Sequence, residues 1–150
     1  MPRIDIDLSE RVRVPVLDVR TAMMIPTVSA MLADGMVDDE EISQILAICM
    51  QSPIYLDSSS DEDLETVLLA VRLVINHGDR EMCQRACERL SPALRETAFA
   101  FAVAIVCSDR LIEQKEEMLI ERLVTWLALD SGRAKSIVSV VPILQRAVDA

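Results

Sequence analysis

SDEDLETVLLAVRLVINHG, residues 60–78, shows most clearly how this chain folds. Its large apolar side chains recur at i, i+3, i+4 and i+7, which is the spacing of one face of an α-helix. They are Leu64, Val67, Leu68, Val71, Val74 and Ile75. Ser60 or Asp61 starts the helix, and Gly78 after His77 is a typical helix stop. The stretch predicts an amphipathic helix with one side buried against its neighbours.

The same spacing extends over most of the chain. It predicts further helices at about 17–33, 38–51, 80–90, 92–107, 113–129 and 133–148. Residues 97–107 are apolar nearly all round, so we expect them in the central, most buried helix. Pro26 either kinks the first helix or opens a shorter one, and Pro142 disturbs the last. Residues 1–15 alternate apolar and charged side chains before Pro15, which predicts an extended arm followed by a single helical domain over 16–150.

Composition limits the class of protein. Apolar residues make up 51% of the chain, which excludes disorder, and the few glycines and prolines favour helices. The net charge is −10, and no Lys/Arg cluster forms the basic stripe that a nucleic-acid-binding protein needs. No apolar run is long enough to cross a bilayer, and the N-terminus does not resemble a signal peptide. The four cysteines show no secreted-domain framework, so we expect a cytoplasmic protein that is not an integral membrane protein.

Two segments 75 residues apart repeat one pattern of acidic and apolar residues. The first is DGMVDDEE, residues 34–41, and the second is DRLIEQKE, residues 109–116. Each follows an apolar helix and precedes an amphipathic one. The matched pairs are Asp34 with Asp109, Val37 with Ile112, Glu41 with Glu116, Ile45 with Ile120 and Ile48 with Leu123. The predicted fold class is therefore all-α, a compact bundle of about seven helices built from two related helix-turn-helix halves.

The repeated acids have two interpretations. In the first they only cap helices, with Asp38 as N-cap and Glu41 reaching back in a capping box. In the second they bind a cation. Capping explains the second copy less well, because the side chain of Glu113 is too long for a good N-cap. In the first copy, Asp34 lies at the C-terminal end of a helix, where the helix dipole disfavours an anion. Carboxylates converging from both halves would repel one another unless a cation neutralised them, and oxygen ligands alone suit Ca²⁺ or Mg²⁺.

The repeat resembles the tellurite-resistance TerB family and its TerB-like relatives. The resemblance rests on Ala33-Asp34-Gly35-x-Val37-x-x-x-Glu41 and Ser108-Asp109-x-x-Ile112-x-x-x-Glu116, and it covers about 20–145. The second motif departs from the family, because Arg110 stands where glycine is usual. The resemblance implies a bacterial stress-response protein without catalysis, acting with a protein partner in a stress-response complex. Carried over by position, it implies a set of cation ligands: Asp34, Asp38, Glu41, Asp109, Glu113 and Glu116.

Other groupings of reactive residues are weaker. Cys83 and Cys87 lie on one helix face near His77, but two buried small side chains explain them better than a soft-metal site. The chain has one histidine, no nucleophile elbow and no glycine-rich phosphate loop, so we do not expect an enzyme. A second acidic run, residues 57–65, precedes a helix and is explained first by capping. The alternative to cation binding is an acidic protein–protein interaction module in which the repeat acids only cap helices.

Overall fold

The computed structural model describes residues 16–33, 38–107 and 114–145, and these residues form helices without any strand. The α-helices are α2 (Val19–Leu32), α3 (Asp39–Met50), α4 (Ser60–His77), α5 (Asp79–Arg89), α6 (Pro92–Val106), α7 (Gln114–Trp126) and α8 (Ser131–Val140), with 3-10 helices η1 (Pro53–Tyr55) and η3 (Val141–Gln145). The predicted all-α bundle is confirmed. None of the helices described is long and apolar enough to cross a membrane. The extended arm predicted for residues 1–15 lies outside the described residues.

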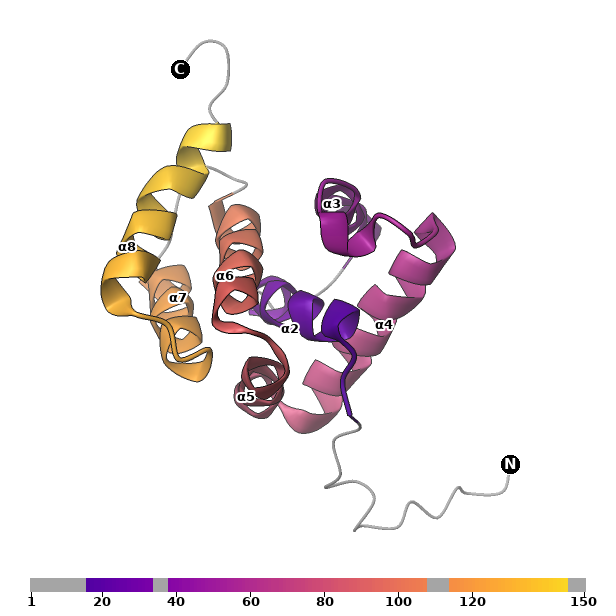
Figure 1. The fold of residues 1–150 in the computed structure, drawn as a ribbon, viewed down its shortest axis with the longest axis horizontal. Helices are drawn as coiled ribbons and strands as arrows, with labels where there is room; N and C mark the ends of the chain where they lie inside the picture. The colour runs from indigo at the N-terminus through magenta and orange to yellow at the C-terminus, as the bar shows by residue number, and fades with distance from the viewer. Residues whose placement is uncertain (1–15, 34–37, 108–113, 146–150) are drawn as a thin grey trace.

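Helix α2 lies at the centre of the bundle. Figure 1 shows α3 and α4 on one side of it and α6, α7 and α8 on the other. Every residue from Thr21 to Met31 is buried, because α2 packs against α4, α5 and α6 and also touches α7. Its short polar side chains tolerate this position, and the hydroxyl of Ser29 lies 3.4 Å from the sulfur of Cys83. The centre of the fold is therefore a helix with contacts on every side.

The prediction that residues 97–107 form the most buried helix is wrong. These residues belong to α6, which packs on α2, α7 and α8. Four of its apolar side chains are only half-buried: Ala100, Phe101, Ala104 and Ile105. An all-apolar surface shows that a helix can be buried, but the extent of packing around it decides how much of its surface is buried. Helix α2 packs extensively against three helices, α4, α5 and α6, whereas α6 packs extensively only against α2, so α2 is buried more completely.

The helix ends follow local signals in the sequence. The hydroxyl of Ser59 accepts a hydrogen bond from the backbone N–H of Glu62 at the start of α4. Ser91 caps α6 by accepting from the N–H of Leu94, with proline at the first helical position. Gly78 ends α4 with a φ of 91°, a value that glycine adopts far more readily than other residues. The predicted start of α4 at Ser60 and its stop at Gly78 are confirmed.

The two prolines act differently. Pro26 lies inside α2, so it does not open a shorter helix, and its missing N–H leaves the carbonyl of Ala22 without the usual helical hydrogen bond. Near the C-terminus, α8 ends at Val140 and the chain continues as the 3-10 helix η3. This agrees with the predicted disturbance of the last helix by Pro142, whose nitrogen cannot donate to the helical ladder, and residues 146–148 of the predicted helix lie outside the described residues.

The helices reproduce the repeat found in the sequence. Helix α3 begins at Asp39 and α7 begins at Gln114, which are 75 positions apart. The preceding helices, α2 and α6, end at Leu32 and Val106, close to the same offset. These two preceding helices pack against each other. The pairs α2–α3 and α6–α7 therefore correspond element by element.

A surface ion pair joins α6 to α8. The guanidinium of Arg133 donates two hydrogen bonds to the carboxylate of Glu96, from Nε at 3.0 Å and from Nη2 at 2.9 Å. These bonds lower the pKa of Glu96 below its ordinary value of 4.5. The bidentate geometry ties α8 to the surface of α6 more firmly than a single contact would.

We expect Arg133→Gln to be less stable than the wild type at neutral pH and equally stable in acid. The pKa of Glu96 is depressed in the folded state, so its ionised form favours folding. This contribution is present above the unfolded-state pKa and is lost as the pH falls through the folded-state pKa, below 4.5. Urea unfolding followed by circular dichroism at pH 6.5 and at about pH 3 measures the difference. Arg122→Gln removes one charge from an exposed side chain of α7 and is the control. Equal losses for both variants at both pH values would contradict the assignment.

Candidate functional site

The predicted cation site falls only in part within the described structure. Three of its six carboxylates lie outside the described residues: Asp34, Asp109 and Glu113. The other three are Asp38, Glu41 and Glu116. The structure therefore shows where three of the proposed ligands lie. That all six carboxylates meet at one point stays a prediction.

Asp38 is the N-terminal cap of α3. Its Oδ1 accepts a hydrogen bond from the backbone N–H of Glu41 at 2.8 Å, and the side chain is exposed. This confirms the predicted role of Asp38 as N-cap. The cap uses one carboxylate oxygen, and Oδ2 makes no hydrogen bond to the residues that the structure describes. Capping and binding of a cation by the second oxygen are therefore compatible.

Glu41 and Glu116 occupy equivalent places in the two halves. Each lies in the first turn of its helix, α3 or α7, and each is half-buried. A carboxylate in the first turn complements the positive end of the helix dipole. Within residues 16–33, 38–107 and 114–145, no three His, Cys, Asp or Glu side chains are grouped so as to hold a metal ion. A complete site would therefore need carboxylates from outside these ranges.

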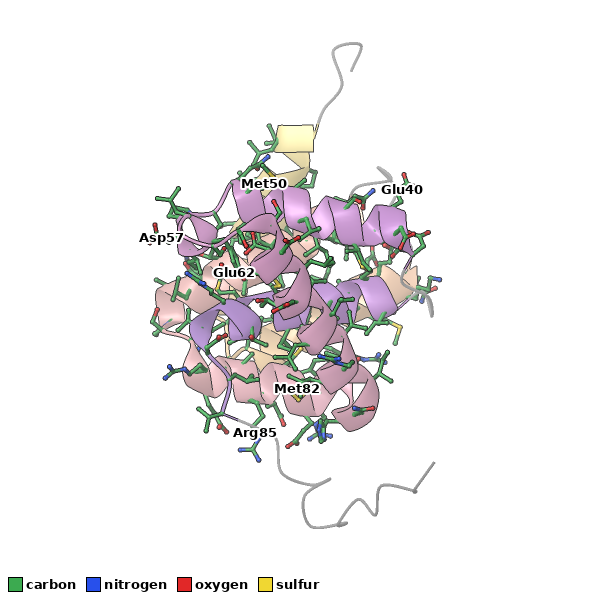
Figure 2. The ribbon with its side chains drawn as sticks, turned by 90° about the vertical axis from the view of Figure 1, so that its right-hand side faces the viewer. Glu40, Met50, Asp57, Glu62, Met82 and Arg85 are labelled. Atoms are coloured by element: carbon green, nitrogen blue, oxygen red, sulfur yellow. The ribbon has the colours of Figure 1, made fainter. Side chains whose placement is uncertain are left out.

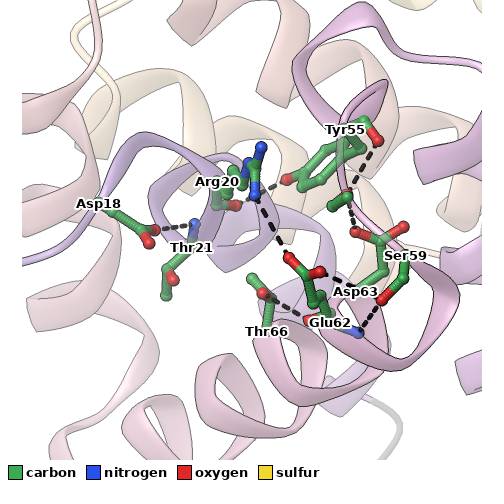
Figure 3. A network of polar contacts seen from close by, with 9 residues as sticks. Asp18, Arg20, Thr21, Tyr55, Ser59, Glu62, Asp63 and Thr66 are labelled. Carbon is green, nitrogen blue, oxygen red and sulfur yellow. Dashed lines mark hydrogen bonds and ion pairs between the residues drawn. The ribbon is translucent and has the colours of Figure 1, made fainter.

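The second acidic run, residues 57–65, lies where α2, η1 and the start of α4 contact one another. Figure 3 shows the contacts around the start of α4. The hydroxyl of Ser58 donates to the buried carboxylate of Asp63, and the Tyr55 hydroxyl donates to the carbonyl of Arg20 at 2.6 Å. The guanidinium of Arg20 lies 3.9 Å from the carboxylate of Glu62. Several acids of this run therefore have structural roles, as the capping interpretation predicts.

The two acidic runs do not form one continuous surface. Figure 2 shows Glu40 at one end of α3 and Asp57 beyond the other end, near Met50. Helix α3 has 12 residues, so it separates the two runs by about 18 Å at 1.5 Å per residue. The described part of the first run, residues 38–41, therefore lies apart from the start of the second run.

The described cysteines behave as packing residues. Cys83 is fully buried, and burial raises the pKa of its thiol to about 12, so it is protonated at neutral pH. Cys107 is buried as well, and Cys87 is half-buried. A thiol reacts as its thiolate, so Cys83 is not a reactive group in the folded protein.

A groove lies between α7 and α8. It has a volume of about 480 Å³. One wall comes from α7 and the other from the length of α8. The groove is lined by Glu117, Ile120, Glu121, Val124, Ser131, Ala134, Lys135, Val138 and Ser139. Its floor is apolar, and its charged side chains lie along the two walls.

This groove was not predicted from the sequence. The lining residues of α7 follow helical spacing, which the sequence shows, and spacing identifies a helix face without identifying what lies opposite. The opposite wall is formed in part by small side chains, Ser131, Ala134 and Ser139, which do not fill the space in front of α7. Helix α8 packs on α6 and η3. The small residues on one face of α8 were the signal that could have indicated a hollow.

No protein-family model, curated protein or solved structure matches this chain.

Proposed function

We propose that this chain is a non-enzymatic, TerB-like stress-response protein that binds a divalent cation through its duplicated acidic motif. The correspondence of α2–α3 with α6–α7 supports this, because it gives Glu41 and Glu116 equivalent positions at the starts of two helices. The donors are carboxylates alone, which suits Ca²⁺ or Mg²⁺ better than zinc or copper. The remaining ligands of the proposal are Asp34, Asp38, Asp109 and Glu113.

A non-catalytic role agrees with the chemistry of the described surface. The one histidine of the chain, His77, ends α4 next to Gly78, where it is the last residue of the helix. Cys83 is a protonated, buried thiol. The walls of the α7–α8 groove contain carboxylates and one ammonium group but no nucleophile beside a base. We therefore infer that the protein acts by binding.

We expect Ca²⁺ or Mg²⁺ to raise the thermal midpoint of EDTA-treated protein. A cation that binds only the folded state adds about 1.4 kcal/mol at ten times its Kd. Differential scanning calorimetry with each cation added back measures the shift. Asp34→Asn combined with Asp109→Asn should abolish it. Asp57→Asn combined with Glu65→Gln removes the same charge from exposed positions of the second acidic run and should leave the shift intact.

Two results would contradict the cation proposal. One is a midpoint that neither cation moves in the wild type. The other is an equal loss of the shift in both double variants, which would indicate general screening of a chain with net charge −10 in place of a defined site.

The second candidate function is an acidic interaction module in which the repeat acids only cap helices. The observation that favours it is the hydrogen bond from the Glu41 N–H to Asp38, which gives that acid a structural role without a cation. This function predicts a partner whose binding weakens with salt, and a melting temperature that does not respond to either cation. The same calorimetric experiment therefore separates the two candidates.

A further inference from the structure

The groove between α7 and α8 has the size and lining of a binding site. Its volume of about 480 Å³ falls in the range of about 300–1,000 Å³ typical of ligand-binding clefts. Among its apolar lining residues, Ile120 and Ala134 are 8% and 4% exposed, and Val124 and Val138 are half-buried. An apolar floor that is open toward solvent and bounded by polar walls is typical of an interaction surface.

Both walls of the groove are helix faces. On α7 the lining positions are 117, 120, 121 and 124, and on α8 they are 131, 134, 135, 138 and 139. Each set follows the i, i+3, i+4, i+7 spacing of a single face. Two such faces with a hollow between them present ridges and grooves that match a third helix. The shape therefore favours a helix as the occupant, in the helix-in-groove mode of peptide recognition.

The charges on the groove walls indicate which side chains of the partner helix should flank its apolar stripe. Glu117 and Glu121 lie one turn apart on α7, and neither forms an ion pair with another residue of the described structure. The opposite wall carries Lys135, while Arg133 on the same helix is held by Glu96. The α7 wall thus offers two free carboxylates, and the whole chain carries a net charge of −10. Both features favour a basic partner and speed its approach.

We propose that the α7–α8 groove binds an amphipathic helix of a partner protein, with an apolar stripe on the groove floor and Lys or Arg side chains against Glu117 and Glu121. Helix α7 has 13 residues, so a partner helix of about three to four turns spans the groove. A second copy of this chain fits less well, because each copy brings the same negative charge. None of the residues that line the groove is a predicted cation ligand, so the proposal does not depend on the proposed cation function.

Designed peptides test the proposal directly. The probe is a dye-labelled helical peptide of about 14 residues, with a leucine stripe at i, i+3, i+4 and i+7 flanked by lysines. One control peptide has glutamate in place of lysine, and another has the same composition with the stripe scrambled. Fluorescence anisotropy with the full-length protein in EDTA should show binding of the lysine peptide alone. The affinity should fall as salt rises from about 0.05 to 0.5 M.

Two serines of α8 provide a matched pair of variants. Ser139 lines the groove and Ser136 does not, yet both are exposed and both hydroxyls donate to a backbone carbonyl of α8. Ser139→Trp places a large ring in the groove and should weaken peptide binding at least about tenfold. Ser136→Trp should leave it unchanged. Circular dichroism confirms that both variants are folded.

Charge reversal tests whether Glu117 and Glu121 select basic side chains of the partner helix. Glu117→Lys with Glu121→Lys should exchange the preference, so that the glutamate peptide binds and the lysine peptide does not. Asp57→Lys with Glu65→Lys makes the same change in net charge on the second acidic run and should keep the preference for lysine.

Several results would overturn the proposal. They are no binding of the lysine peptide at about 1 mM, equal weakening by both tryptophan variants, or loss of the preference only on reversal of the second acidic run. A dimer in sedimentation equilibrium that Ser139→Trp dissociates would assign the groove to a second copy. Binding of both lysine peptides regardless of stripe would reduce the contact to general charge attraction. None of these results bears on the calorimetric response to Ca²⁺ or Mg²⁺, so the two proposals fail separately.

Discussion

Replacing Phe99 with alanine is expected to lower the free energy of unfolding by about 3–5 kcal/mol. Phe99 is completely buried in the middle of α6, the helix that packs most closely on α2. The chain has only two phenylalanines and one tryptophan, so most of the core consists of aliphatic and methionine side chains. A phenyl-sized cavity in a close-packed interior removes both hydrophobic burial and dispersion contacts. The loss is a large part of the total stability of about 5–15 kcal/mol usual for a domain.

Phe101 provides the control for this experiment. It lies two residues further along α6 and is half-buried, so Phe101→Ala removes the same atoms from a site that water already reaches. Urea unfolding followed by circular dichroism should give a clearly smaller loss for Phe101→Ala, at similar m-values for both variants. Equal losses would show that α6 turns a different face toward the core than the structure indicates.

The helices of this fold could be predicted because their signals are local. Ser59, Gly78 and Ser91 mark helix ends by the conformation and hydrogen bonds of neighbouring residues alone. The centre of the bundle could not be predicted in the same way. The apolar residues 97–107 do belong to a helix that is partly buried, but α2 packs extensively against three helices and is buried further. Neighbours are a property of the tertiary arrangement, which periodicity within one helix does not contain.

The candidate site likewise has features set by neighbouring residues, which the sequence predicts, and features set by tertiary packing, which it does not. The cap formed by Asp38 depends only on residues 38–41, which are adjacent in the sequence, so it was predictable. Convergence of Asp34 and Asp109 depends on how the two halves meet, and it stays a prediction. The α7–α8 groove depends on small side chains of α8 lying opposite α7 without filling the space between them. A sequence pattern identifies a face, and only the packed structure shows that the face lacks a partner.

The junction of α4 and α5 depends on one glycine, and Gly78→Ala is expected to destabilise the protein by about 2 kcal/mol. Gly78 has φ 91° and ψ 152°, a region that is almost restricted to glycine. Its N–H donates to the carbonyl of Val74 at 2.8 Å, and its own carbonyl accepts from Met82 at 3.1 Å. No atom lies within 4 Å of an added Cβ, so the cost comes from the backbone conformation and not from a steric clash with neighbours. Thermal and urea unfolding measure the loss.

Ala128 gives the opposite test of the same backbone argument. It has φ 53° at the end of α7, where its N–H donates to Thr125 and the N–H of Leu129 donates to Val124, as in a Schellman motif. Glycine is the usual residue at this position, so Ala128→Gly should stabilise the protein by about 0.5–1 kcal/mol, even though glycine raises the entropy of the unfolded chain. If Gly78→Ala cost nothing, or if Ala128→Gly destabilised as much as a glycine within a helix does, the positive φ angles would not be the cause. Opposite signs for the two substitutions would attribute both effects to backbone conformation, because neither changes a charge or a polar side chain.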